Sequence, residues 1–235
     1  MAKKKRVSRK KLLKEPDEFL TVSARALQFA AENRKQLSYV LIGLLVVVLA
    51  GALIGYFLNL SQRRAYRVFD EGLSHYVAQV SGGETSSQFQ EMAKEKFAEA
   101  IENHSSTRAA ELSLPLYGNL HYEAGSYDKA IELYRQALEA FPGEEGMEKL
   151  IWNGLAYAYE GKGEYKAAAE WFEKIADSES GFLKADAYFN LGRMYEAMGK
   201  GQEAREAYQR LVEAFPNAVH FRIAKEKVQR LQGQS

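Results

Sequence analysis

Few side chains in this sequence have the types and spacing that chemistry requires. Gly161-Lys162-Gly163 should form a turn, but no strand precedes it and the rest of a phosphate-binding loop is missing. There is no cysteine, so disulfides, thiol catalysis, cysteine-ligated metals and a lipidated cysteine are excluded. The histidines stand at no metal-ligand spacing: His75, His104, His121 and His220. We therefore expect no catalytic residue, no cofactor and no metal, and a protein that is not an enzyme.

Small residues recur in register through the C-terminal half. Ala130, Ala168 and Ala204 follow one another at steps of 38 and 36 residues. The segment before each alanine also holds one small residue and, further on, a glycine. These small residues are Gly118, Ala156 and Gly192, and the glycines are Gly125, Gly163 and Gly199. This pattern is typical of the tetratricopeptide repeat, a pair of antiparallel helices.

The physical basis of the pattern is close helix packing. Two helices approach closely only where one lacks bulk, and a glycine that ends the first helix can adopt the left-handed conformation. About three such pairs are needed to bury a continuous core. A general amphipathic bundle is the alternative, but it would not repeat small and aromatic residues in register. Pro115 departs from the pattern, and it either starts its helix with Ser113 as the cap or lies inside the helix and kinks it.

The repeats set the expected domain boundaries. Residues 61–107 form a degenerate leading helix pair, with Ala93, Phe97 and Ala100 as the core of its second helix and a turn at 81–87. Residues 108–217 hold three repeats, and residues 218–235 form a capping helix with a polar outer face. The apolar stripe of that helix consists of Phe221, Ala224, Val228 and Leu231.

An apolar segment precedes the repeats. Tyr39 to Leu58 contains no charged residue, and as a helix it would match the roughly 30 Å hydrocarbon core of a bilayer. We expect a transmembrane helix at 39–60, with a cleaved signal peptide as the alternative. Gly51 and Gly55 form a GxxxG pair, which permits contact with another helix in the membrane. The expected fold class is all-α: a single N-terminal transmembrane helix followed by a tetratricopeptide-repeat α-solenoid.

Charge predicts the orientation in the membrane. Residues 1–38 carry 11 basic and 4 acidic residues, a net of +7, while the rest carries 21 basic and 27 acidic residues, a net of −6. The positive-inside rule then places the N-terminus in the cytoplasm and the repeats in the periplasm of a bacterial inner membrane. The basic run from Lys3 to Lys14 is a topology signal, or it binds anionic lipid or ribosomal RNA. We expect no specific nucleic acid. After Pro16, a short helix with Leu20, Ala24, Leu27 and Ala31 on one face could lie along the membrane or touch a partner.

The junction before the span carries a family resemblance. The sequence Phe29-Ala30-Ala31-Glu32-Asn33-Arg34-Lys35 leads into an apolar run that ends Gly51-Ala52-Leu53-Ile54-Gly55-Tyr56. Together with the basic tail and the repeats, it resembles the ancillary subunit of the Sec translocon (YfgM-like proteins). The resemblance implies association with the translocon, with a membrane-anchored periplasmic chaperone and with exported clients, and it implies no catalysis.

In the repeat fold, fixed positions of the first helices line a concave groove. They suit an extended or helical peptide, because aromatic residues anchor apolar side chains and Asn bonds the peptide backbone. Some of them could instead pack against the capping helix. The candidate partner-binding residues are Asn119, Tyr122, Asn153, Tyr157, Phe189 and Arg193, beside Glu160 and Glu196.

Three functions fit this sequence. The resemblance favours a membrane-anchored adaptor at the translocon. The same architecture would serve as a scaffold for another envelope machine, such as cytochrome maturation, cell division or secretion. The third possible function is that of a cytoplasm-facing regulator that acts through its basic tail.

Overall fold

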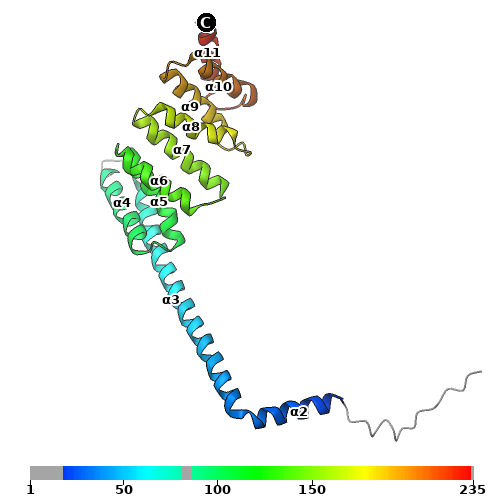
Figure 1. Cartoon of the computed structure of the whole chain (residues 1–235). Helices are drawn as coiled ribbons and strands as arrows, with labels where there is room; N and C mark the ends of the chain where they lie inside the picture. The colour runs from blue at the N-terminus through cyan, green and yellow to red at the C-terminus, as the bar shows by residue number, and fades with distance from the viewer. Residues whose placement is uncertain (1–17, 81–85, 234–235) are drawn as a thin grey trace, which may run out of the picture. The chain divides into compact units, whose positions relative to one another are not determined.

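The computed structural model describes residues 18–80 and 86–233, and within them it contains ten helices, α2 to α11, and no strand (Figure 1). The chain divides into two compact units, residues 1–59 and 60–235. The predicted basic run from Lys3 to Lys14 and most of the predicted turn at 81–87 lie outside the described residues.

The first unit contains α2 (Glu18–Glu32) and the beginning of α3 (Arg34–Val80). Only Asn33 separates the two helices, and its backbone N–H donates to the Phe29 carbonyl oxygen at 2.9 Å. Of the described residues, one stretch, Arg34–Gln79, is long and apolar enough to cross a membrane, a test that a signal sequence near the N-terminus also passes. The large apolar side chains between Tyr39 and Leu58 are all exposed.

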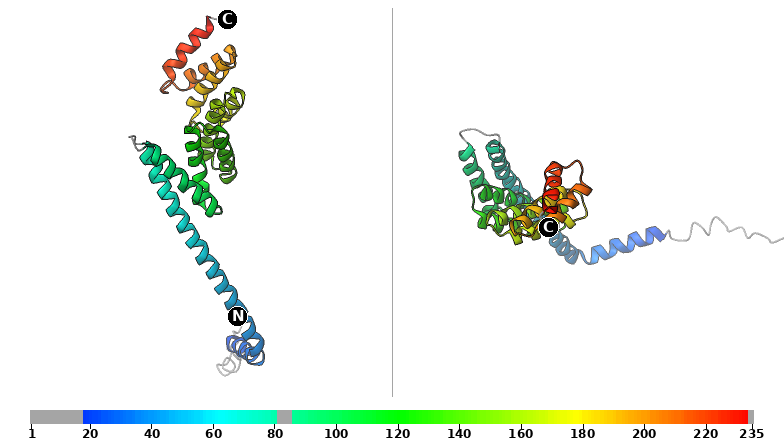
Figure 2. Two further views of the ribbon diagram at one scale, coloured as in Figure 1. Left: turned by 90° about the vertical axis from the view of Figure 1, so that its left-hand side faces the viewer. Right: turned by 90° about the horizontal axis from the view of Figure 1, so that it is seen from above.

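The second unit is a stack of helix pairs in chain order (Figures 1 and 2). From α4 onward, each helix packs on the next one along the chain. The residues of α3 from 60 onward and α4 (Ser86–Asn103) lead the stack. The following pairs are α5 (Arg108–Glu123) with α6 (Tyr127–Ala140), α7 (Glu145–Gly161) with α8 (Tyr165–Asp177), and α9 (Lys184–Ala197) with α10 (Gly201–Ala214). The last helix is α11 (Phe221–Gln232).

The small residues of the first helices accommodate aromatic rings of the second helices. A Cβ atom at Gly118 would lie 2.7 Å from the Tyr134 ring, and one at Gly192 would lie 2.5 Å from the Tyr208 ring. In the middle pair, Ala156 and Phe172 are both fully buried. The missing bulk thus makes room for a ring from the partner helix, as well as for close backbone approach.

The glycines that follow these first helices have the expected conformation. Gly125, Gly163 and Gly199 have φ of +74°, +76° and +74°, which strains residues with a side chain. After Gly125, the Ser126 N–H donates to the His121 carbonyl oxygen at 2.8 Å and closes the turn.

Pro115 lies inside α5, so the alternative in which Ser113 caps the helix is wrong. The cap is Thr107, whose side-chain oxygen accepts from the Ala110 N–H at 3.3 Å. Ser113 is fully buried within the helix, and its hydroxyl donates to the Ala109 carbonyl oxygen at 2.8 Å. Thr107 captures an N–H of the first turn, so the helix starts two turns before the proline.

The residues of α4 that match repeat positions form a core with α3. Ala93, Phe97 and Ala100 are fully buried. The Phe97 ring lies 6.1 Å from that of Phe69 and 6.4 Å from that of Tyr76, both on α3. In α11, Ala224 is fully buried, and Phe221, Val228 and Leu231 pack around it.

Candidate protein-binding groove

The six candidate groove residues come from the first helices of three consecutive pairs, α5, α7 and α9. Four of them line one pocket of about 440 Å³ between α5 and α7: Asn119, Tyr122, Asn153 and Tyr157. We call it the groove pocket. It is also lined by Phe69, Leu112, Pro115, Leu116, Tyr134, Met147, Leu150 and Gly154.

The wall of the groove pocket is largely carbon. Tyr134 is buried between the two helices, since a Cβ atom at either Gly118 or Gly154 would lie 2.7 Å from its ring. Leu150 remains 48% exposed. Covering an apolar wall that is open to solvent with another apolar group lowers the free energy of the system, so this wall favours binding of an apolar side chain.

Two polar groups of the groove pocket have no partner. Within residues 18–80 and 86–233, no group makes a hydrogen bond with the Asn153 amide or the Tyr122 hydroxyl. Burial raises the pKa of the Tyr122 hydroxyl, so at neutral pH this group keeps its proton and can donate. An amide offers two donors and an acceptor, which match a peptide backbone.

The other two candidate residues in the pocket, Asn119 and Tyr157, are held in place. The Asn119 Oδ1 accepts from the Tyr134 hydroxyl at 2.7 Å, and its Nδ2 donates to the Tyr76 hydroxyl at 3.3 Å. The Tyr157 hydroxyl accepts from Asn190 Nδ2 at 2.8 Å, and burial is the main cause that raises its pKa. These bonds fix two side chains of the wall before any partner arrives.

Arg193 lies outside the groove pocket and joins two repeats. Its guanidinium donates to the Glu160 carboxylate at 2.5 Å and to Asn190 Oδ1 at 2.8 Å. Its side chain is 39% exposed, so it can still reach a bound molecule beyond the pocket.

Phe189 lies under the capping helix, as the packing alternative predicts. Its ring stacks on His220 at 4.2 Å with an interplanar angle of 10°, and it packs with the cluster around Ala224. Glu196 accepts from the Tyr208 hydroxyl at 2.8 Å, from Lys227 at 2.6 Å and from Arg230. In the third repeat, Phe189 and Glu196, which were expected to line the groove, therefore contact the capping helix and the residue before it.

Sequence reasoning did not identify the apolar wall of the pocket. Leu112, Pro115, Leu116 and Asn119 follow the i, i+3, i+4, i+7 spacing of one helix face, and Met147, Leu150 and Asn153 follow a similar one. That spacing could have extended the groove by about two turns towards the start of each helix. The role of Asn190, which holds both Tyr157 and Arg193, carries no comparable signal.

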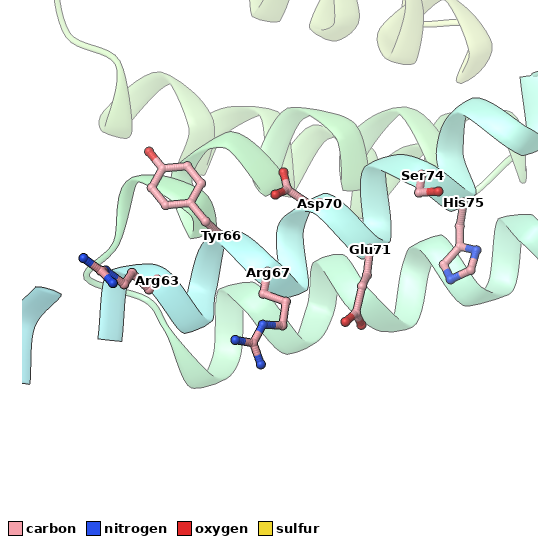
Figure 3. A pocket seen from close by; sticks show the side chains of 7 residues that line it. All are labelled: Arg63, Tyr66, Arg67, Asp70, Glu71, Ser74 and His75. Atoms are coloured by element: carbon pink, nitrogen blue, oxygen red, sulfur yellow. The ribbon is translucent and has the colours of Figure 1, made fainter. Parts of the chain in front are cut away.

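A second hollow lies along α3 and is not a comparable site. Figure 3 shows its seven lining side chains, Arg63, Tyr66, Arg67, Asp70, Glu71, Ser74 and His75, spaced along one helix. Glu71 pairs with Lys96 at 3.0 Å, and the His75 ring stacks on Phe89 at 6.1 Å. Because one helix supplies every lining residue, no second element closes the hollow around a ligand.

Comparison with known proteins agrees with the repeat architecture. The tetratricopeptide-repeat family matches residues 91–145, 116–181 and 186–218, just over half of the chain. A crystal structure of MamA is 19% identical, with a TM-score of 0.52 over 64% of this chain and 82% of the other. A tetratricopeptide repeat protein from Parabacteroides merdae is 15% identical, with a TM-score of 0.57 over 72% of this chain and 61% of the other.

At these identities the structural likeness concerns the fold alone. The repeat spacing, the small-residue and aromatic pairs and the turn glycines agree with the family matches. This chain belongs to the tetratricopeptide-repeat family.

Proposed function

We propose that this protein is a membrane-anchored adaptor that binds another protein in the groove between α5 and α7. Tetratricopeptide-repeat domains generally mediate protein–protein interaction. The observation that carries the proposal is the groove pocket, in which the free groups of Asn153 and Tyr122 face solvent within an apolar wall. An apolar side chain of the partner would fill the pocket while its backbone bonds the Asn153 amide.

The membrane anchor in this proposal is the segment Tyr39 to Leu58. Its large apolar side chains are exposed, and a bilayer would cover them. The net charge of +7 in residues 1–38 supports a cytoplasmic N-terminus and a periplasmic repeat domain at a bacterial inner membrane.

The partners in this proposal are the Sec translocon, a membrane-anchored periplasmic chaperone and exported clients. Support comes from the junction Phe29 to Lys35, which resembles that of the translocon's ancillary subunit. Association of the chain with a different envelope machine would leave the groove proposal intact and change only the partner.

Introducing a negative charge at two matched positions tests the groove. Leu150→Glu places a carboxylate at the mouth of the groove pocket, whereas Phe182→Glu places one at an apolar residue of similar exposure, 50%, outside it. Desolvating the new carboxylate opposes binding. We expect translocon and chaperone subunits to be recovered from detergent-extracted membranes with the wild type and Phe182→Glu, and lost with Leu150→Glu.

Two results would count against the proposal. Equal recovery with both variants would place the binding surface elsewhere. Protection of the repeat domain from protease in intact spheroplasts would place it in the cytoplasm and exclude periplasmic partners.

A further inference from the structure

The apolar face of α2 has no partner in the described part of the chain. Val22, Leu27 and Phe29 are 64%, 72% and 61% exposed. At about 100° per residue, Ala26 and Ala30 lie at the centre of this face, with Val22 and Phe29 on one side and Ser23 and Leu27 on the other. The face shares only Leu27 with the stripe of Leu20, Ala24, Leu27 and Ala31 that the sequence predicts, and it is turned towards Val22 and Phe29. This face of α2 is therefore largely apolar, and its large side chains are exposed to solvent.

The opposite face of α2 is polar. Arg25, Gln28 and Glu32 project there by the same helical spacing, and the Gln28 amide donates to the Glu32 carboxylate at 3.1 Å. A helix with one apolar and one polar face, rather than apolar residues all round, suits a boundary between an apolar and an aqueous phase.

The chain itself brings such a boundary to α2. Only Asn33 separates α2 from α3, and the apolar segment begins at Tyr39, about 9 Å further along a helix that rises about 1.5 Å per residue. The headgroup layer of each leaflet is about 5–8 Å thick. The end of α2 is therefore tethered at the outer edge of the headgroup layer when α3 crosses a bilayer.

Charge next to α2 complements phospholipid phosphates. Among residues 18–35, the three basic residues Arg25, Arg34 and Lys35 outnumber the two acidic residues Glu18 and Glu32. The sequence before α2 adds eight further basic residues from Lys3 to Lys14. A basic surplus beside an apolar face favours an anionic lipid surface over a second copy, which would bring like charges together.

We propose that α2 is an interfacial helix, whose Val22, Ala26, Leu27 and Phe29 insert into the phospholipid surface that α3 crosses. This inference rests on the membrane anchor proposed above. It assigns α2 a role that is separate from the groove, because the helix would fix how the anchor sits at the membrane.

Site-directed spin labelling tests the inference on the full chain. The sequence has no cysteine, so a single cysteine introduced at each position from 22 to 32 carries the only label. The protein is reconstituted in vesicles of phosphatidylethanolamine and phosphatidylglycerol. Collision with oxygen, which partitions into lipid, is compared with collision with a water-soluble nickel chelate. The oxygen-to-chelate ratio should be at least about threefold higher at Val22 and Phe29 than at Arg25 and Gln28.

A label at Val47, inside the apolar segment and 71% exposed, separates the two possible failures. Water accessibility at Val47 would refute the anchor itself. Lipid exposure at Val47 with a flat, aqueous profile along α2 would refute only the interfacial helix. Spin–spin broadening at Leu27 that grows with the protein-to-lipid ratio would show a second copy on this face and would also overturn the inference.

A matched pair of variants gives an independent check. Phe29→Asp should lower the oxygen-to-chelate ratio at Val22 to the aqueous value, because a carboxylate on the apolar face must stay hydrated. Gln28→Asp adds the same charge to the polar face and should leave the ratio unchanged. Equal effects of the two variants would contradict the proposal.

Discussion

At the scale of single residues, the repeat depends on space left for a ring. Tyr134 contacts glycines of two helices, Gly118 and Gly154, and so forms both the core of its repeat and the floor of the groove pocket. Its hydroxyl then fixes Asn119 at the pocket wall. The same packing feature that stabilises the repeat also positions a side chain of the candidate site.

Gly192 tests this dependence without touching the groove pocket. In Gly192→Ala, the new Cβ atom would lie 2.5 Å from the Tyr208 ring, so the ring must shift. We expect a loss of about 1–3 kcal/mol in the free energy of unfolding. In a unit of this size, that corresponds to a fall of roughly 2–12 °C in the melting temperature of the full chain in detergent.

Gly201→Ala is the matched control. The nearest atom to a Cβ there is Leu231 Cδ2 at 3.9 Å, which is ordinary contact, and the residue begins α10. Its melting temperature should be unchanged or slightly raised, because alanine reduces the freedom of the unfolded chain. Similar falls in melting temperature for Gly192→Ala and Gly201→Ala would refute the explanation that Gly192 makes room for the Tyr208 ring.

Individual residues also show how far the sequence could predict the site. Tetratricopeptide positions identified Asn119, Tyr122, Asn153 and Tyr157, which the structure brings to one pocket. The same positions placed Phe189 in the groove, yet it stacks on His220. That contact has a physical cause: the repeat pattern describes pairs in the middle of a stack, and the last pair meets a capping helix instead of another repeat.

At the scale of elements, the loop between α8 and α9 depends on a buried lysine. Lys149 is fully buried, and its ammonium donates to the Ser180 carbonyl oxygen at 3.1 Å and pairs with Glu145 at 2.7 Å. The loop ends at Leu183, which has φ of +62°. Helical periodicity does not predict the contact between Lys149 and Ser180, because a lysine in the sequence is normally expected to be exposed to solvent.

Replacing Lys149 should loosen that loop. Lys149→Ala removes the donor to Ser180 and leaves a cavity, so we expect a loss of about 2–4 kcal/mol in the free energy of unfolding. Lys149→Met keeps most of the side-chain volume, so its loss in the free energy of unfolding should be smaller. Hydrogen exchange should accelerate at residues 178–183 in both variants, and unchanged exchange there would contradict the assignment.

The capping helix is a second element held by charge. Partial burial opposes ionisation of Glu196, but hydrogen bonds from Lys227 and Tyr208 hold the pKa of its carboxyl below the ordinary value of 4.5. A lowered folded-state pKa contributes stability above the unfolded pKa, and this contribution is lost as the pH falls through the folded value.

Acidification should therefore release α11 before the rest of the stack. Below about pH 4.5, exchange of the α11 amides should accelerate in the wild type. Glu196→Gln should show fast exchange at neutral pH, with a loss of about 1 kcal/mol and no further change on acidification. A wild-type pH profile in the variant would show that another group holds the helix.

At the scale of the whole molecule, the proposed anchor and the proposed binding domain lie in two compact units of one chain. The all-α repeat architecture was predictable because small residues and rings recur in register. Most of the turn at 81–87 and the whole basic run lie outside the described residues, so the domain boundaries and the role of the tail remain predictions. Nothing in one sequence identifies the partner, since a groove selects its ligand by shape and free polar groups rather than by repeat spacing.

Gly51 and Gly55 bear on how the anchor associates. A Cβ atom at either position meets nothing within 4 Å, so larger side chains fit the helix itself. Gly51→Leu and Gly55→Leu should weaken a complex extracted from membranes if a partner helix approaches there. Ala50→Leu adds a leucine side chain to the same segment on a different helix face from the glycine pair and serves as the control. Unchanged co-purification with the glycine variants would remove this contact.

Photocrosslinking from the groove pocket tests the adaptor function most directly. A photoreactive residue at Leu150, on the pocket wall, is compared in intact cells with one at Phe182, which has similar exposure outside the pocket. We predict a discrete protein adduct from Leu150 that disappears when Asn153→Ala removes the free amide, and no such adduct from Phe182. Identical adduct patterns from the two positions, or an adduct that Asn153→Ala does not weaken, would contradict binding in this groove.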